Sequence, residues 1–434
     1  MLCVRGTKSP LFFDRSIVMT VPDTIRIGFP DGIASGGEVK ISGSKSQSNR
    51  LLLLQAATGG RFTIDNLSDS HDTRAMLRVL AQDGAGRVDV GHAGTAMRFG
   101  TAFLAVQAGR ETLLTGSDRM KQRPIAPLVE ALRALGADIR YDEREGYPPL
   151  RIRGGALPGG ECTIDSSVSS QFITALMLVA PTLERGLRLH LSGRSVSRPY
   201  IELTASVLRS VGLECSFEGD EVRVPAGVVS FDGTITVESD WSSASYYYAL
   251  AAVARKAFRL TSFRADSVQG DSRLARLYGE YFGVDTVFAP QGVLHLVPRK
   301  DFVAPLHLSL DMENTPDVAQ SVAVTMAALR IKGRLTGLQT LRVKETDRIA
   351  ALDAELAKFG VVCTAGPDTL ALESFSSRRA EIFLETYQDH RMAMAFVPLA
   401  WEGAFSVLQP DVVSKSYPRF WEDMASLGLK IEGR

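Results

Sequence analysis

The chain repeats one local pattern, in which an amphipathic helix is followed by glycine and then by a short apolar strand. Six copies occur at intervals of 52 to 77 residues, and their glycines are Gly84, Gly136, Gly212, Gly283, Gly360 and Gly428. Each glycine stands where a left-handed residue commonly ends a helix. The intervals are too long and uneven for a solenoid. We therefore expect a larger αβ unit, used six times and arranged as two lobes of three.

The composition is that of a soluble globular protein, and its 434 residues suggest two or three domains. Lys and Arg number 49, as do Asp and Glu, so the zero net charge argues against a general nucleic-acid binder but permits a local cationic pocket. No apolar run reaches membrane-spanning length. The cysteines at positions 3, 162, 215 and 363 show no metal or disulfide spacing, which favours a reducing cytoplasm.

Residues 342–348, Arg-Val-Lys-Glu-Thr-Asp-Arg, concentrate charge at a predicted strand-to-helix turn. If this stretch is extended, Arg342 and Lys344 share one face and Glu345 points the other way. A strongly helical segment follows, with Thr346 or Asp347 as its N-cap. Because helix N-termini favour anions, this turn is a candidate anion site, although a charged helix start has the same pattern.

A second candidate lies at residues 42–50, Ser-Gly-Ser-Lys-Ser-Gln-Ser-Asn-Arg, before a predicted apolar helix over 51–57. Small residues let backbone N–H groups approach an anion, while Lys45 and Arg50 supply charge and Ser46 a hydroxyl. The stretch is not a P-loop, because it lacks Gly-Lys-Ser/Thr and the earlier glycine. A phosphate or carboxylate site is therefore expected here.

Further polar or cationic turns precede other predicted helices, and these turns are 91–98, 116–124, 165–171, 195–200, 314–317, 389–391 and 414–418. Arg98 lies one turn into its helix, and Arg123 stands just before Pro124 at the expected first helical position. The serine-rich turn 165–171 is equally typical of an ordinary helix cap. Helix N-termini carry about half a positive charge, so their convergence would attract small polyanions between the lobes.

These motifs together resemble the 5-enolpyruvylshikimate-3-phosphate synthases, also called 3-phosphoshikimate 1-carboxyvinyltransferases, over about residues 39–422. The matching stretches are Gly43-Ser-Lys-Ser, Ser48-Asn-Arg, Ala93-Gly-Thr-Ala-Met-Arg, Arg119-Met-Lys with Arg123-Pro-Ile, Ser169-Ser-Gln-Phe, Pro199-Tyr, Ser242-Ser-Ala-Ser-Tyr, Pro316-Asp, Arg342-Val-Lys-Glu-Thr-Asp-Arg and Asp389-His-Arg-Met-Ala-Met.

The resemblance implies an α/β (α+β) fold of two lobes. Each lobe would contain three βαβαββ units with helices inside and sheets outside, and the active site would lie in the interlobe cleft. The expected boundaries are residues 1–42 and 239–434 for a terminal lobe and 43–238 for a central lobe.

The implied activity is transfer of the enolpyruvyl group of phosphoenolpyruvate to the 5-hydroxyl of shikimate 3-phosphate, with release of phosphate. This is a shikimate-pathway step in aromatic amino acid biosynthesis, and glyphosate is the family inhibitor. The expected enzyme is a cytoplasmic monomer that uses no metal or organic cofactor and has no nucleic-acid or membrane partner.

Matching positions imply roles for individual residues. Those expected to hold shikimate 3-phosphate are Lys45, Ser46, Arg50, Ser169, Ser170, Gln171, Ser197, Tyr200, Asp317, Thr340 and Lys344. Those expected to hold phosphoenolpyruvate are Lys45, Gly94, Arg98, Arg123, Gln171, Arg348, His390, Arg391 and Lys415. The expected catalytic residues are Asp317, Glu345, Lys45 and Lys344. Of these, Asp317 and Lys344 would serve the attacking hydroxyl, and Glu345 the methylene carbon.

The expected site has a cationic surplus that matches its substrates. Eight of its residues are cations, and with Asp317 and Glu345 they leave six positive charges. Two phosphates at about −1.5 to −2 each, with two carboxylates, bring about −5 to −6. The chain departs from the common family pattern at His92, Phe99, Arg198 and Thr340, where Asn, Pro, Lys and Asn are usual.

Two other functions have to be weighed. The related transferase that acts on UDP-N-acetylglucosamine typically carries a reactive cysteine on the loop before the third helix. Residues 4–161 contain no cysteine, and that loop reads Asp118-Arg-Met-Lys-Gln-Arg. A non-catalytic anion-binding module would need the cations but not carboxylates such as Asp317 and Glu345.

Overall fold

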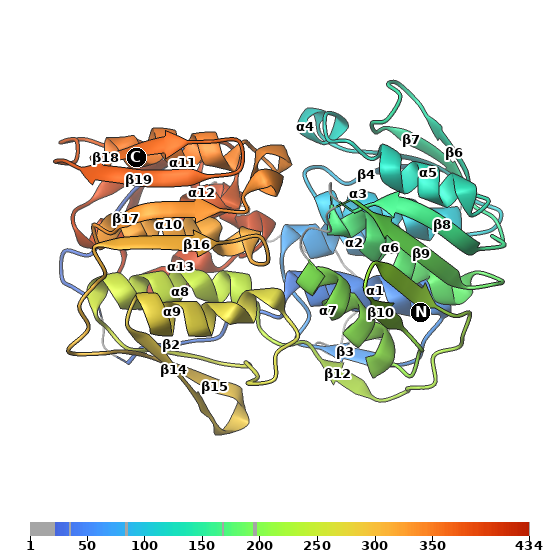
Figure 1. Ribbon diagram of the computed structural model, residues 1–434, viewed down its shortest axis with the longest axis horizontal. Coiled ribbons are helices and arrows are strands. Elements are labelled where there is room, and N and C mark those ends of the chain that lie inside the picture. Colours follow the sequence, from blue (N-terminus) through green and yellow to red (C-terminus); the bar gives the residue numbers. More distant parts are fainter. Residues whose placement is uncertain (1–21, 34–35, 83–85, 167–168, 194–197, 434) are drawn as a thin grey trace. The chain divides into compact units, whose positions relative to one another are not determined.

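The computed structural model describes residues 22–33, 36–82, 86–166, 169–193 and 198–433 (Figure 1). The chain forms two compact units. The central unit contains Gly43–Val237 and Val268–Gly270, and the terminal unit contains the described parts of Gly6–Ser42, Glu238–Ser267 and Asp271–Arg434. In the described part of the chain, no helix is both long and apolar enough to cross a bilayer.

The central unit contains most of the blue-to-green elements of Figure 1. Its strands are β3 (Thr63–Asp65), β4 (Gly86–Asp89), β5 (Glu111–Thr115), β6 (Asp138–Tyr141), β7 (Leu150–Arg153), β8 (Gly160–Asp165), β9 (Leu187–Ser192), β10 (Ser216–Glu218), β11 (Glu221–Val224) and β12 (Thr234–Thr236). Its helices are α1 (Lys45–Thr58), α2 (His71–Leu80), α3 (Gly94–Ala105), α4 (Asp118–Lys121), α5 (Ala126–Ala134), α6 (Ser170–Val179) and α7 (Arg198–Ser210).

The terminal unit is mostly yellow to red in Figure 1. Its strands are β1 (Thr24–Gly28), β2 (Glu38–Val39), β13 (Phe258–Leu260), β14 (Val284–Ala289), β15 (Val293–Pro298), β16 (His307–Asp311), β17 (Lys332–Thr336), β18 (Val361–Ala365), β19 (Leu370–Phe375), β20 (Phe383–Leu384), β21 (Phe405–Leu408) and β22 (Lys430–Gly433). Its α-helices are α8 (Trp241–Ala254), α9 (Leu274–Tyr281), α10 (Ala319–Ala328), α11 (Arg348–Lys358), α12 (His390–Ala395) and α13 (Phe420–Ser426). Its 3₁₀ helices include η4 (Pro316–Val318), η5 (Gln339–Val343), η6 (Val397–Trp401) and η7 (Pro410–Lys415).

One sheet topology recurs in both units. The sheets β4-β5-β7-β6, β8-β9-β11-β10, β16-β17-β19-β18, β2-β13-β15-β14 and β20-β21-β1-β22 all have four strands. In each of them the first two strands are parallel and the others pair antiparallel. Strands β3 and β12 form a sixth, two-stranded parallel sheet. The five four-stranded sheets have the strand pattern of the predicted βαβαββ unit, whereas the sixth sheet is shorter.

The helix-ending glycines behave as the sequence predicts. Gly136, Gly212, Gly283, Gly360 and Gly428 all have positive φ, between 67° and 107°. Each follows a helix and precedes a strand, namely β6, β10, β14, β18 and β22. Gly84, the sixth, lies outside the described residues. The chain can therefore reverse direction from an interior helix into a sheet strand at these positions without steric cost.

Within each unit the helices lie inside and the sheets lie outside. In α1, eight consecutive residues from Ser48 to Gln55 are buried, and in α8 only two of 14 residues are not. A helix buried on all sides belongs to the interior. Strands such as β7 and β8 alternate buried and exposed positions instead, as expected of sheets with one solvated face.

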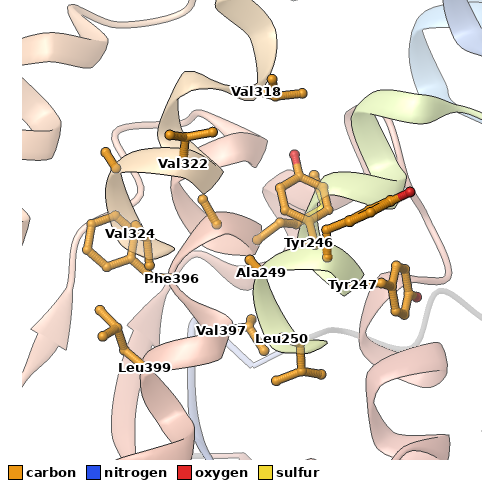
Figure 2. Close-up of a cluster of buried hydrophobic side chains, with 14 of the residues drawn as sticks. Tyr246, Tyr247, Ala249, Leu250, Val318, Val322, Val324, Phe396, Val397 and Leu399 are labelled. Atoms are coloured by element: carbon orange, nitrogen blue, oxygen red, sulfur yellow. The ribbon is translucent and has the colours of Figure 1, made fainter. Parts of the chain in front are cut away.

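The core of the terminal unit supports the helices that carry its polar turns. Side chains of α8, of the segment around α10 and of residues 396–399 pack against one another, including Tyr246, Val322 and Phe396 (Figure 2). Because α10, α11 and α12 contact one another, their N-terminal turns are held as one rigid group.

Candidate active site

The first part of the central unit's site is the start of α1. This helix begins at Lys45, with Ser44 as N-cap, and not at residue 51 as the sequence suggested. Lys45 and Ser46 therefore occupy the first helical turn, where backbone N–H groups lack intrahelical partners. The Lys45 ammonium lies 3.0 Å from Asp72 Oδ2, a carboxylate at the start of α2 that sequence reasoning missed.

Arg50 is buried among three helices. Its guanidinium donates to the Ser46 carbonyl at 2.7 Å, to the hydroxyls of Thr204 and Thr174 at 2.9 and 3.3 Å, and to the Tyr200 carbonyl at 3.4 Å. Burial lowers its pKa from 12.5 to about 10. Arg50 therefore ties together the first turns of α1 and α7, which carry Ser46 and Tyr200.

Two guanidiniums meet at the start of α3. A Cβ atom at Gly94 would lie 2.8 Å from Arg123 Nη1 and 3.0 Å from Arg98 Nη1. Arg98 and Arg123 are both more than nine-tenths buried, and Arg98 also donates to the Gly94 carbonyl at 3.2 Å. Two like charges buried so close together favour an anion between or beside them. The helix following Arg123 begins at Ala126, so Pro124 does not occupy its predicted first position.

The start of α6 lies against the start of α3. Ser169 is the N-cap of α6 and accepts from the Gln171 backbone N–H at 3.3 Å. The Gln171 side-chain amide reaches Thr95 Oγ1 at 3.4 Å, which brings Gln171 beside Gly94. Ser170 is buried in the same turn. Ser197, another predicted residue, lies outside the described residues.

In the terminal unit, the charged stretch 342–348 differs from its predicted geometry. Residues 339–343 form the 3₁₀ helix η5 and not an extended strand, so the predicted sharing of one face by Arg342 and Lys344 is wrong. Arg342 instead donates to the backbone carbonyls of Gly366 and Pro367. The predicted N-cap is confirmed: Asp347 accepts from the backbone N–H groups of Ile349 and Ala350.

Asp317, just before α10, is surrounded by cations. Its Oδ1 lies 3.3 Å from Arg348 Nη1 and 3.6 Å from Lys344 Nζ, and its Oδ2 lies 3.3 Å from Arg391 Nη2. These four residues come from η4, the η5–α11 turn and α12. The structure thus brings together one predicted catalytic carboxylate and three predicted substrate-binding cations.

Glu345 is held in the same network. One of its oxygens lies 3.0 Å from Arg348 Nη2 and the other lies 2.5 Å from Lys415 Nζ. Lys415 comes from η7, about seventy residues further along the chain, and is nine-tenths buried. Glu345 and Asp317 are therefore linked through Arg348, and each also contacts at least one further cation.

Arg348 is the centre of this network and is 1% exposed. Besides Asp317 and Glu345, it donates from Nε to Asp389 Oδ2 at 2.7 Å and from Nη2 to Oδ1 at 3.3 Å. Burial alone would lower the pKa of Arg348, but the carboxylates, Asp389 foremost, raise it above its ordinary value. Arg348 is therefore a fixed cation, and Asp389 is a second carboxylate whose part sequence reasoning missed.

Two remaining predicted residues lie on the same elements. His390 opens α12 and is buried, with its Nδ1 3.6 Å from Asp389 Oδ1. Thr340 lies in η5, and its hydroxyl oxygen is buried with no hydrogen-bond partner in the described part of the chain. A buried hydroxyl of this kind costs free energy unless a ligand satisfies it.

Each unit thus presents a cluster of cations. We call the cluster of Lys45, Arg50, Arg98 and Arg123 the central half-site. The terminal half-site consists of Lys344, Arg348, Arg391 and Lys415 with Asp317 and Glu345. Asp72 and Asp389 reduce the cationic surplus expected from the sequence from six charges to four. Across the described residues, no group of three or more His, Cys, Asp or Glu side chains has an arrangement that could hold a metal ion.

Comparison with known proteins shows the family to which the chain belongs. The model of one family, EPSP synthase (3-phosphoshikimate 1-carboxyvinyltransferase), matches residues 32–87 and 80–424. The chain belongs to the EPSP synthase family.

Relatives of this family are similar over almost the whole chain. A 3-phosphoshikimate 1-carboxyvinyltransferase from Bacteroides fragilis (strain YCH46) is 42% identical, over 91% of this chain and 96% of the relative. One from Sodalis glossinidius is 39% identical, over 90% and 94% of the two chains. A solved structure of EPSP synthase from Acinetobacter baumannii has a TM-score of 0.72 at 22% identity and covers 94% of this chain and 99% of that chain.

The EPSP synthase assignment confirms the predicted fold class and enzyme class. It decides against the transferase that acts on UDP-N-acetylglucosamine and against a non-catalytic anion-binding module. The reaction of EPSP synthases is enolpyruvyl transfer from phosphoenolpyruvate to shikimate 3-phosphate.

Proposed function

We propose that this EPSP synthase binds shikimate 3-phosphate and phosphoenolpyruvate through both half-sites, and that Asp317 and Glu345 move the protons of the reaction. The observation that carries this proposal is the linked ion-pair network. Asp317 and Glu345 share Arg348, and each also contacts cations that can bind a phosphate or carboxylate. A merely structural carboxylate has no need of so many cations.

For the central half-site, we propose that the starts of α1, α6 and α7 hold shikimate 3-phosphate. Lys45 and Ser46 offer charge and a hydroxyl in the first turn of α1, and Ser169 to Gln171 offer neutral hydroxyl and amide groups at the start of α6. Arg50 donates four hydrogen bonds within the unit, so its main part is to orient Ser46 and Tyr200. A partly positive helix start suits a phosphate.

For phosphoenolpyruvate, we propose the cation pair at Gly94 and the cations of the terminal half-site. Arg98 and Arg123 converge at the start of α3. Arg348, Arg391 and Lys415 converge on Asp317 and Glu345. Because phosphoenolpyruvate carries a phosphate and a carboxylate, it can take a guanidinium or ammonium at either end.

The proposed chemistry is addition followed by elimination. The 5-hydroxyl oxygen of shikimate 3-phosphate bonds to the central carbon of phosphoenolpyruvate, its proton passes to Asp317 with Lys344 alongside, and the methylene carbon takes a proton from Glu345. The resulting methyl group then returns a proton to Glu345 as the bond to the phosphate oxygen breaks, which restores the double bond. The departing phosphate takes up the proton held by Asp317, so that both carboxylates return to their starting states.

Lys415 links substrate binding to this proton transfer. It contacts Glu345 at 2.5 Å, and a substrate anion that binds Lys415 competes with Glu345 for the ammonium. Loss of that ion pair lets the carboxylate bind a proton more tightly, as a general acid requires. Glu345 would therefore become an acid when phosphoenolpyruvate is bound.

We also propose that the enzyme works as a cytoplasmic monomer, because both half-sites are built from one chain and both substrates are small polar molecules.

The test is an acceptor comparison. Phosphate release from phosphoenolpyruvate is measured with shikimate 3-phosphate, with shikimate and with UDP-N-acetylglucosamine. We expect release with shikimate 3-phosphate alone, and its loss in Asp317→Asn. Equal release with UDP-N-acetylglucosamine, or an unaffected Asp317→Asn variant, would contradict the proposal.

A further inference from the structure

A second buried carboxylate lies on the helix that carries Arg348. Glu355 is seven residues further along α11, so two helical turns place it on the same face. It is 0% exposed. No residue of the reaction proposed above contacts Glu355, yet an ionised carboxylate is rarely buried without several partners.

Glu355 accepts four hydrogen bonds. Lys358 Nζ lies 2.8 and 2.7 Å from its two oxygens, the Tyr387 hydroxyl donates to Oε1 at 2.9 Å, and the Glu385 backbone N–H donates to Oε2 at 3.1 Å. Lys358 also donates to the Phe383 carbonyl at 2.9 Å. The partners of Glu355 and Lys358 outside α11 therefore all lie in the segment 383–387.

That segment has an unfavourable backbone. Tyr387 and Gln388 have φ of 52° and 55°, two consecutive left-handed residues of which neither is glycine or asparagine. Such a conformation persists only when the surroundings hold it. Glu355 is a buried group that can hold this turn, because it accepts from the Glu385 backbone N–H, two residues before Tyr387, and from the Tyr387 hydroxyl. The Glu385 carboxylate adds a bond from the Tyr387 backbone N–H at 3.2 Å.

The same segment ends in the active-site turn. Asp389 directly follows Gln388, caps α12 by accepting from the Arg391 backbone N–H at 2.9 Å, and binds the Arg348 guanidinium. One face of α11 thus binds residues 383–391 at two places: Glu355 binds residues 385 and 387, and Arg348 binds Asp389.

We propose that Glu355 is a positioning residue for phosphoenolpyruvate binding, which holds the left-handed turn at Tyr387 and Gln388 and so orients Arg348 and Arg391. This inference rests on the proposed function, because that function assigns these two guanidiniums to phosphoenolpyruvate. Glu355 itself touches no substrate in this scheme.

The charge and shape of Glu355 both matter. Glutamine has nearly the same shape, but its amide is itself a donor and faces the Tyr387 hydroxyl, the Glu385 N–H or the Lys358 ammonium. Glu355→Gln therefore leaves at least one buried donor without an acceptor and removes the negative charge that pairs with Lys358. The turn can then relax toward ordinary φ values, and the Asp389–Arg391 pair moves with it.

The experiment measures KM for each substrate and kcat for the parent and for Glu355→Gln, well below the melting temperature of both. We expect KM for phosphoenolpyruvate to rise roughly two- to thirty-fold, the range seen for residues that act through others. KM for shikimate 3-phosphate should change less than about twofold. A purely structural role would lower the melting temperature and leave the ratio of the two KM values unchanged.

Two further variants keep the test decisive if Glu355→Gln folds poorly. Tyr387→Phe removes one hydrogen bond to Glu355 and should raise the same KM by a smaller factor. Its matched control is Tyr278→Phe, which removes a buried hydroxyl bonded to Thr325 at 2.8 Å elsewhere in the terminal unit and should leave both KM values unchanged. Glycine adopts a φ of 55° freely. Adding Gln388→Gly to Glu355→Gln or to Tyr387→Phe should therefore restore the affinity for phosphoenolpyruvate.

The possible failures are distinguishable. A parent enzyme that releases no phosphate from phosphoenolpyruvate would overturn the proposed function. An active parent, with Tyr387→Phe behaving like Tyr278→Phe and no effect of Gln388→Gly, would overturn the role of Glu355 alone.

Discussion

At the scale of single residues, the proposed proton-transfer role of Glu345 can be tested directly. Its carboxylate lies between Arg348 and Lys415 at 3.0 and 2.5 Å, and two cations this close favour its ionised form. Glu345→Gln keeps the shape but cannot exchange a proton. We expect turnover to fall by roughly two to four decades, the usual scale for a general acid or base.

Binding separates this role from a structural one. Calorimetry of Glu345→Gln with shikimate 3-phosphate should give an affinity close to that of the parent. Turnover within about threefold of the parent would remove Glu345 from the chemistry.

Lys415 should matter for one substrate only. In Lys415→Ala, Glu345 keeps Arg348 as a partner, so the terminal half-site is not left with an unpaired carboxylate. A charge-assisted hydrogen bond is worth about 1.5–3 kcal/mol, which predicts a ten- to hundred-fold weaker binding of phosphoenolpyruvate. Competition and KM measurements on both substrates test this. An equal loss for shikimate 3-phosphate would show that Lys415 has been assigned to the wrong ligand.

Asp271 predicts a pH dependence of stability. Burial and, secondarily, the charge of Asp317 raise its pKa to about 7, and the Ser242 hydroxyl donates to it. A raised pKa means that the folded state binds the proton more tightly than the unfolded chain. The contribution of Asp271 to the free energy of unfolding is therefore complete below about pH 4 and is lost as the pH rises through 7.

Asp271→Asn should remove that loss. The free energy of unfolding is measured in urea at pH 5 and at pH 7. Between these two pH values we expect it to fall by about 2 kcal/mol more in the parent than in the variant. Asp266→Asn is the control, because Arg264 holds the pKa of exposed Asp266 low and it stays ionised over this range. Parallel pH profiles for the parent and Asp271→Asn would contradict the prediction.

Residues with a local motif could be predicted from the sequence, and their distant partners could not. Lys45, Arg348 and Arg391 stand in short charged turns before helices, which sequence patterns recognise. Asp72 and Asp389 become partners of these cations only through folding: Asp72 is 27 residues from Lys45, and Asp389 is 41 from Arg348. A single carboxylate in a helix or turn gives no signal of which distant cation it will meet.

At the scale of elements, helix–glycine–strand units were predictable because glycine is favoured where φ must be positive. The conformation of residues 339–343 was not. Alternating charges favoured an extended strand, whereas the chain forms a 3₁₀ helix in which Arg342 binds carbonyls of residues 366 and 367. Those acceptors lie more than twenty residues away, so a tertiary contact overrode the local pattern.

The start of α3 gives a prediction about Gly94. A Cβ there would meet Arg123 Nη1 at 2.8 Å and Arg98 Nη1 at 3.0 Å, the far ends of long side chains. Gly94→Ala should therefore fold, because the close contacts are with the ends of side chains and not with backbone. Displaced guanidiniums should raise KM for phosphoenolpyruvate by about tenfold, as expected for the loss of about 1.4 kcal/mol of binding energy.

Gly100→Ala is the matched control on the same helix. Its Cβ would meet Val79 Cγ1 at 3.0 Å, an apolar contact between α3 and α2. We expect a changed melting temperature and unchanged KM values. If both variants alter KM alike, the effect belongs to the packing of α3 and not to its anion-binding end.

At the scale of the whole molecule, five four-stranded sheets of one topology and a sixth, two-stranded sheet belong to two compact units with their own cores. The proposed function requires both half-sites to share each substrate. Neither half-site alone carries all the residues assigned to shikimate 3-phosphate, because Lys45 and Arg50 lie in the central unit and Asp317 and Lys344 in the terminal unit.

This sharing can be tested by hydrogen exchange of the complete chain with shikimate 3-phosphate as the only ligand. Amides that contact the ligand, or that belong to turns it orders, open less often and exchange more slowly. We expect slower exchange both in residues 44–50 of the central unit and in residues 342–349 of the terminal unit. Inorganic phosphate at the same concentration is the control for a simple anion effect, and it should protect these segments much less. Protection confined to one unit would show that a single half-site binds shikimate 3-phosphate and that the other half-site serves phosphoenolpyruvate alone.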